Sequence, residues 1–271
     1  MKYGKTLAGV LILLVYLFPI YWMVSTSLKS SGDVFSAPPQ LIPSPVTLAS
    51  YLDAALTEPA VLRGLLNSTV ISLGALLLTL LLGVPAAYGL ARLRLGFTLL
   101  ISMTFLVAQM LPSINIALPI FVIFSRLGLV DSYLGLILAN TAFSLSFAVI
   151  VLRPYFYSVP ESLVDAARVD GCSRFGAFVR VVLPLARPGL ITVGALSLVG
   201  TWGEFVFGLT LTTSEQMQPV TVVLNRFIGQ YETRWNDLMA VATIAALPVM
   251  VLFTGLQRFI VSGLTSGATK D

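Results

Sequence analysis

A carboxylate and an indole lie two residues apart in a long apolar stretch of the sequence. Glu204 is the one charged residue between positions 188 and 214, and Trp202 precedes it. A charged side chain at the centre of a membrane helix costs about 2.5–3.5 kcal/mol on insertion scales. Two interpretations are open: the pair faces a polar path through a membrane, or the carboxylate pairs with a neighbouring helix and holds a subunit interface. A helix starting near residue 188 places Glu204 roughly 24 Å along its axis.

The composition excludes several kinds of catalytic chemistry. The 271 residues include no histidine and one cysteine, Cys172. Zinc sites that need histidine, Ser-His-Asp triads and histidine general bases are therefore excluded. The sequence also lacks the G-x-x-x-x-G-K-[ST] phosphate loop, so hydrolysis of ATP by that route must occur on a partner. We expect no catalytic residue and no metal site on this chain, and a membrane-embedded enzyme is disfavoured.

A polar loop at residues 153–187 carries the most distinctive local pattern. Ser158, followed three residues later by Glu161, predicts a helix start with a side-chain cap. That helix should end at Gly171, which suits a C-terminal cap, and a second helix should start at Ser173.

One face of this loop helix is narrow. Leu163, Ala166, Ala167 and Asp170 have the spacing i, i+3, i+4, i+7 and so share a side. Such a face suits insertion into a groove on a soluble partner. The alternative is an amphipathic helix lying on lipid headgroups, attracted by the basic residues of the loop. The pattern alone does not separate the two.

The elements that position these residues are apolar helices. Hydrophobic residues make up 57% of the chain and charged residues 10%, against about 25% charged in a soluble domain. About 20 apolar residues span a bilayer as a helix. We therefore predict a single all-α integral membrane domain over residues 1–271. Its six spans are expected at residues 6–28, 66–91, 97–125, 132–152, 188–211 and 238–257.

The third of these spans contains Pro112 and Pro119, with Gln109 and Asn115 nearby. The prolines either break the helix beside a solute cavity or merely kink it; we favour the kink. In the second span, Gly74, Gly83 and Ala87 suit close helix packing.

The loops predict the orientation. With the N-terminus inside, the inner segments hold 11 of the 16 lysines and arginines and the outer segments 5. Basic residues favour the cytoplasmic side, so we expect both termini and loop 153–187 in the cytoplasm. Loops 29–63 and 212–237 then lie outside. They are long enough to contact another protein, but connectors with an aromatic anchor at Trp235 explain them equally well.

The loop also carries a family resemblance. Asp165-Ala166-Ala167, then Gly171 four residues on, then Val181-Val182-Leu183-Pro184, resembles the EAA loop of binding-protein-dependent ABC importer permeases. The family pattern is E-A-A, a glycine, and I-x-L-P. Asp165 replaces the glutamate and Val181 the isoleucine, and both changes keep charge or shape.

Further segments resemble sugar-importer permeases of the maltose type, and the likeness extends over nearly the whole chain. They are residues 21–29 at the end of the first span, Asn67-Ser68, residues 86–92, residues 126–131, Trp202-Gly203-Glu204-Phe205 and residues 263–270.

The resemblance implies a type I ABC importer permease fold, of the MetI and MalG-like kind, in the cytoplasmic membrane of a prokaryote. Its implied partners are a MalF-like second permease subunit, an ATPase dimer that uses ATP and Mg²⁺, an extracytoplasmic sugar-binding protein and membrane lipid, with no nucleic acid. The chain itself is expected to hold no cofactor. Di- or oligosaccharides are the implied cargo, with glycerol-phosphate-type substrates as a rival.

It also implies roles for particular residues. Coupling to the ATPase is expected at Glu161, Asp165, Ala166, Ala167, Asp170, Gly171 and Pro184. Trp202 and Glu204 would line the substrate pathway, where an indole and a carboxylate suit sugar rings and hydroxyls. Gln218 and Tyr231 would contact the binding protein, and the tail at residues 265–270 would approach the ATPase. The alternative function is a secondary transporter or channel without an ATPase partner, which usually buries more ionisable residues.

Overall fold

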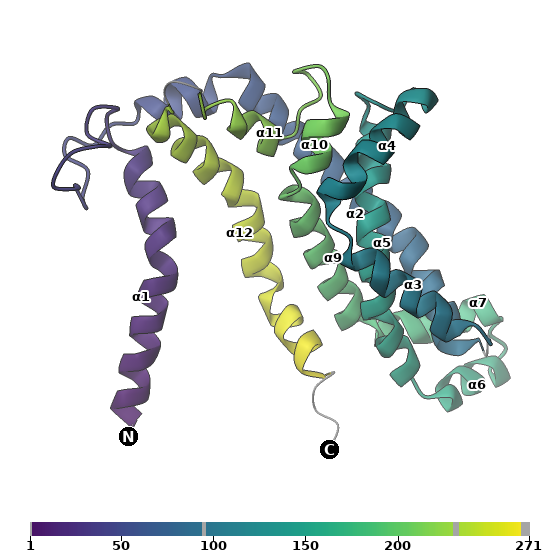
Figure 1. The fold of residues 1–271 in the computed structure, drawn as a ribbon. Coiled ribbons are helices and arrows are strands. Elements are labelled where there is room, and N and C mark those ends of the chain that lie inside the picture. The colour runs from purple at the N-terminus through teal and green to yellow at the C-terminus, as the bar shows by residue number, and fades with distance from the viewer. Residues whose placement is uncertain (1, 94–95, 230–232, 267–271) are drawn as a thin grey trace. The chain divides into compact units, whose positions relative to one another are not determined.

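The computed structural model describes residues 2–93, 96–229 and 233–266, and regular structure in these ranges is helical. Apart from helices, the described residues form one isolated bridge, between Ile228 and Thr233. The chain divides into two compact units, Met1–Leu66 with Gln218–Pro248, and Asn67–Met217 with Val249–Asp271. Two long helices, α2 (Pro59–Arg92) and α12 (Trp235–Ser266), contribute residues to both units (Figure 1).

The first unit contains α1 (Lys2–Ser27), the π-helical segment η1 (Tyr51–Leu56) and α11 (Val220–Asn225), together with the first turns of α2 and α12. Ala55, Val61 and Val241 are fully buried in its core. The loop after α1 folds back on that helix, because Lys29 Nζ donates to Gln40 O at 2.6 Å and lies 4.6 Å from the centre of the Trp22 ring.

The second unit contains the remaining helices around α5 (Tyr133–Ser158). They are α3 (Thr98–Met110), α4 (Ser113–Leu127), α6 (Glu161–Val169), α7 (Arg174–Ala177), the π-helical η2 (Phe178–Val182), α8 (Leu183–Leu185), α9 (Arg187–Trp202) and α10 (Val206–Leu211). α5 packs against α3, α9 and α10, and α10 also packs against α4 (Figure 1).

Glycine permits the close approach of α2 to α5. A Cβ at Gly74 would lie 2.5 Å from Ile137 Cδ1, and one at Gly83 would lie 3.2 Å from Ala148 Cβ. A side chain at Gly74 would require Ile137 to move, and one at Gly83 would press on Ala148, so both glycines lie at a close helix contact as predicted.

Four helices among the described residues are long and apolar enough to cross a membrane: α1, α2, α5 and α12. Two bent pairs raise the number to six if each pair counts as one span. The helices differ in length from the expected spans: α2 starts before residue 66, and α5 continues past residue 152. Both loops that were expected outside, 29–63 and 212–237, contain helical segments, η1 and α11.

The expected kink in the third span is wrong, because the helix breaks. α3 ends at Met110, α4 begins at Ser113, and their axes differ by 100°. Leu111 precedes Pro112 and takes an extended backbone with ψ 122°, since a proline disfavours the helical conformation in the residue before it. Pro119 lies inside α4 without a comparable break.

Candidate functional site

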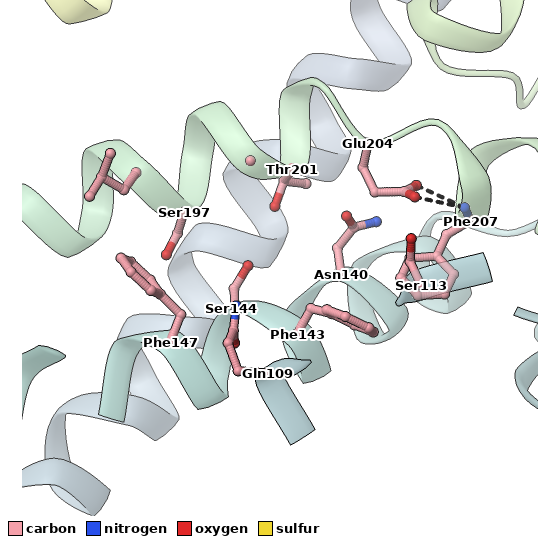
Figure 2. Close-up of a pocket in the computed structure, with 12 residues that line it drawn as sticks. Gln109, Ser113, Asn140, Phe143, Ser144, Phe147, Ser197, Thr201, Glu204 and Phe207 are labelled. Carbon is pink, nitrogen blue, oxygen red and sulfur yellow. Dashed lines mark hydrogen bonds between the residues drawn. The ribbon is translucent and has the colours of Figure 1, made fainter. Parts of the chain in front are cut away.

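A cavity of about 390 Å³ lies between α3, α4, α5 and α9 in the second unit (Figure 2). Its volume is in the range of small-molecule pockets. Its wall combines hydroxyl and amide groups with aromatic rings. The lining residues are Gln109, Ser113, Asn140, Phe143, Ser144, Phe147, Leu196, Ser197, Gly200, Thr201, Glu204 and Phe207.

Glu204 lies at a helix break rather than within a continuous span, which corrects the predicted helix over residues 188–211. α9 ends at Trp202 and α10 begins at Val206. The two carboxylate oxygens each accept from Phe207 N at 2.9 Å, and Oε2 also accepts from Gly208 N at 3.2 Å (Figure 2). The carboxylate thus satisfies backbone donors at the start of α10, which otherwise lack partners.

Polar side chains spaced four residues apart face the cavity from two helices. Asn140 and Ser144 are on α5, and Ser197 and Thr201 point toward them from α9 (Figure 2). Asn140 donates to Leu136 O at 2.9 Å, which fixes its amide in the wall. Ser197 Oγ is buried and finds no hydrogen-bond partner among the described residues. A buried hydroxyl without a partner is unfavourable.

Aromatic rings form the other part of the wall. The rings of Phe143 and Phe207 are 5.4 Å apart between centroids and tilted by 58°, an arrangement that holds both rings in place. Phe147 lines the cavity as well. Trp202, which the sequence paired with Glu204, is 9% exposed and is not among the lining residues.

The segment after α10 is pinned by residues of two other elements. Asp131 Oδ1 accepts from Thr213 N at 3.0 Å and from Ser214 N at 2.9 Å. Asn67 Nδ2 on α2 donates to Gln216 O at 2.8 Å, and its oxygen accepts from the hydroxyl of Tyr133. Residues 213–216 are therefore held in a fixed position at the end of the broken span.

Burial tends to raise the pKa of the Asp131 carboxyl, but the hydrogen bonds from Ser214 and Thr213 outweigh it, so the pKa lies below its ordinary value. Asp131 has a positive φ of 58°. Aspartate tolerates this left-handed conformation better than most residues.

Two arginines join the ends of α2 and α5 reciprocally. Arg92, at the end of α2, donates to Val159 O between α5 and α6. It also lies 3.6 Å from the Glu161 carboxylate, and its own side chain is 14% exposed. Arg153 on α5 donates to Leu90 O of α2 at 3.3 Å. Each arginine thus satisfies a carbonyl near the C-terminus of the other's helix, where carbonyls lack helical partners.

The predicted side-chain cap of the loop helix is wrong. Ser158 is the last residue of α5 and donates to Tyr155 O at 2.9 Å. Val159 is extended because Pro160 follows it, so α6 begins at Glu161 without a side-chain cap. The predicted end is confirmed, with Gly171 at φ 90°. The next helix also starts at Ser173 as predicted, and the structure adds a side-chain cap, in which Ser173 Oγ accepts from Gly176 N at 3.0 Å.

α6 is attached to the rest of the unit by one side. Val164 packs against the core of α2, α5 and η2. Asp165 and Glu161 line a hollow of about 260 Å³ with Tyr88 and Arg92. The remaining coupling candidates lie elsewhere: Ala166, Asp170, Gly171 and Pro184 are exposed, and Ala167 is half-buried.

Of the two binding-protein candidates, the structure describes only Gln218. Gln218 is half-buried and its Oε1 accepts from Arg226 Nε at 3.0 Å. Tyr231 lies outside the described residues, as do residues 267–270 of the tail that was expected near the ATPase. No group of three histidine, cysteine, aspartate or glutamate side chains suited to a metal ion occurs in the described ranges.

Sequence reasoning missed several residues of these two sites. The cavity wall includes Asn140, Ser144, Ser197 and Thr201. These form two polar pairs at i, i+4 within apolar runs, a spacing that puts each pair on one face of its helix and could have indicated the wall. For Arg92 no local signal existed, because its partners lie about 70 residues away in the sequence.

Comparisons with known proteins agree with this architecture. Residues 79–266 match the family model described as a binding-protein-dependent transport system inner membrane component. The permease protein SmoH of a sulfoquinovosyl glycerol transport system from Agrobacterium fabrum is 35% identical over 266 residues, covering 98% of this chain and 93% of that protein. The trehalose transport system permease protein SugB from Mycobacterium tuberculosis is 36% identical over 263 residues, covering 94% and 92%.

Among solved structures, a chain of a bacterial ABC transporter involved in the import of the acidic polysaccharide alginate has the same fold. The TM-score is 0.79 at 22% identity, with 95% of this chain and 96% of that chain covered. From the family match over most of its length, together with these relatives, this chain belongs to the inner membrane components of binding-protein-dependent transport systems.

Proposed function

We propose that this chain is the permease subunit of an ATP-driven carbohydrate importer. It forms half of the translocation path for a di- or oligosaccharide, and α6 couples it to a separate ATPase dimer. The other half is a MalF-like permease subunit, and an extracytoplasmic sugar-binding protein delivers the cargo. The chain itself carries out transport rather than catalysis, with ATP and Mg²⁺ used on the ATPase.

The one-sided attachment of α6 is the observation that carries this proposal. Val164 and Glu161 hold the helix to the second unit, while Leu163 and Ala166 are exposed on its opposite side. An exposed leucine beside small alanines allows another surface to approach closely. Relatives named for sugar transport, and the ABC transporter with the same fold, support the carbohydrate cargo and the ATPase partner. The family description itself refers to a binding protein.

Site-directed cross-linking tests the coupling role, because the chain has a single cysteine. In a Cys172→Ser background, Ala166→Cys places a thiol on the exposed side of α6. A thiol–amine cross-linker in native membranes should join this position to an ATPase subunit. Ala49→Cys is the matched control, an exposed alanine in loop 29–63, and should give no such product.

Uptake measurements complete the test. Sugar accumulation should stop when cellular ATP is depleted while the membrane potential is maintained. Uptake that continues without ATP, with no ATPase cross-linked at Ala166, would instead show a secondary transporter or channel.

A further inference from the structure

We infer that the cavity at the two helix breaks is a subsite for a neutral sugar ring, and that it disfavours acidic sugars. This inference rests on the proposed function and specifies the class of carbohydrate. Its grounds are the distribution of charge, hydroxyl groups and rings in the cavity wall.

The wall complements the two sides of a pyranose, which has an apolar C–H side and polar hydroxyl groups. The half-buried rings of Phe143 and Phe147 can pack against the C–H side of a sugar ring, and the buried ring of Phe207 packs against Phe143. On the polar side, Asn140, Ser144, Ser197 and Thr201 supply amide and hydroxyl groups for sugar hydroxyls. Ser144, which is half-buried, is the most accessible of these four side chains.

The charge of the wall sets its selectivity. Within the described part of the chain, the lining residues include one carboxyl group, that of Glu204, and neither lysine nor arginine. An anionic ligand would lose hydration without gaining a cationic partner, and such burial of a charge is strongly unfavourable. Repulsion from Glu204 adds to that cost. A neutral sugar has no such penalty, because its hydroxyls exchange water for the polar wall.

The cavity lies beside two helix breaks. α3 and α4 separate at Pro112, between the lining residues Gln109 and Ser113, and α9 and α10 separate at Glu204. Irregular backbone is tolerated within a membrane where it lines a cavity. Discontinuous helices also build substrate sites in other transporters. Glu204 stabilises its break through the N–H groups of Phe207 and Gly208.

The inference can be tested by asking whether a bound sugar protects a cysteine in the cavity wall from labelling. The binding protein is left out, so that its own selectivity does not affect the result. In the Cys172→Ser background, Ser144→Cys replaces a lining hydroxyl by a thiol of similar size. The purified transporter complex, without binding protein, is labelled with a small maleimide in the presence of trehalose, which is neutral, or sulfoquinovosyl glycerol, which carries a sulfonate. Trehalose should slow labelling about threefold at twice its dissociation constant, since the vacant fraction falls as 1/(1 + [L]/Kd). Sulfoquinovosyl glycerol at the same concentration should leave the rate unchanged.

Gln109 offers a charge change at an exposed position of the wall. Gln109→Lys should allow the sulfonated sugar to protect Ser144→Cys, whereas Gln109→Glu should keep the preference for trehalose. If the sulfonated sugar protects Ser144→Cys as well as or better than trehalose while Gln109 is unchanged, the inference is overturned. Absence of protection by either sugar, in a complex that still accumulates sugar on ATP, would overturn it while leaving the proposed function intact. Loss of ATP-driven uptake and of the ATPase cross-link at Ala166 is the separate result that contradicts the proposed function.

Discussion

Asp131 connects the loop between α4 and α5 to the segment that follows α10. Its side chain accepts from two successive backbone N–H groups, and its own N–H donates to Leu211 O at 2.8 Å. Three hydrogen bonds at one residue hold the end of the broken span, and two of them depend on the ionised carboxylate.

The pH dependence of stability follows from this geometry. The pKa of Asp131 in the folded chain lies below its ordinary value of 3.8. A group whose pKa is lowered by folding stabilises the folded chain when the pH is above its pKa in the unfolded chain. This stabilisation is lost as the pH falls through the pKa in the folded chain. Asp131→Asn should therefore lower the melting temperature at pH 7 and differ less from the unmodified protein near pH 3. Thermal melting in detergent at several pH values measures this.

Glu58→Gln is the control for that series, since Glu58 is an exposed acid in the other unit. Its melting temperature should follow the unmodified protein throughout. A difference between Asp131→Asn and the unmodified protein that stays constant from pH 7 to pH 3 would contradict the assigned role.

The junction between α2, α5 and α6 depends on arginine geometry. Arg92 reaches both Val159 O and Glu161, and a planar guanidinium can do so where a lysine ammonium provides a single point charge. This junction holds the base of α6 to the end of a membrane helix. A shift of α2 would therefore move α6 with it.

Removing Arg92 should loosen α6. Arg92→Ala removes the hydrogen bond to Val159 O, and loss of a hydrogen bond to a charged group typically costs about 1.5–3 kcal/mol. The ion pair with Glu161 adds little, because that carboxylate is largely exposed. We expect faster trypsin cleavage at Arg168 and Arg174 in the loop, together with a lower melting temperature. Arg63→Ala, an exposed arginine on the same helix, should change neither. Unchanged cleavage in Arg92→Ala would show that the junction does not position α6.

Local sequence signals predicted some helix ends and missed others. Gly171 and Ser173 behave as predicted, because a left-handed glycine and a serine cap are set by their own backbone neighbours. Ser158 is also a serine that could cap a helix, but it is the last residue of α5. Pro160 makes Val159 extended, so the end of α5 falls between Ser158 and the start of α6. The break at Pro112 was mistaken for a kink, since whether a proline bends or ends a helix depends on the packing around it.

Across the chain, composition and charge predicted more of the fold than of the site. Apolar runs located the helices because their lengths must match the bilayer. The cavity was harder to predict, because its wall combines residues that are 95 positions apart, from Gln109 to Glu204. Trp202 illustrates the limit: it is two residues from Glu204 in the sequence, yet it does not line the cavity.

The orientation of the chain is testable with its natural cysteine. The asymmetry of 11 inner against 5 outer basic residues predicts that Cys172 lies in the cytoplasm. A membrane-impermeant maleimide should label Cys172 only after cells are permeabilised. Ala49→Cys in the Cys172→Ser background should be labelled in intact spheroplasts. Labelling of Cys172 in intact spheroplasts would reverse the predicted orientation.

The break at Pro112 has a consequence for biosynthesis. α3 has 13 residues and α4 has 15, and both are shorter than the 20 or so that a single helix needs to cross the hydrocarbon core. Neither half can be recognised alone as a complete span when it leaves the ribosome. If the pair forms one span, we expect the insertion machinery to retain α3 until α4 has emerged and to release the two together.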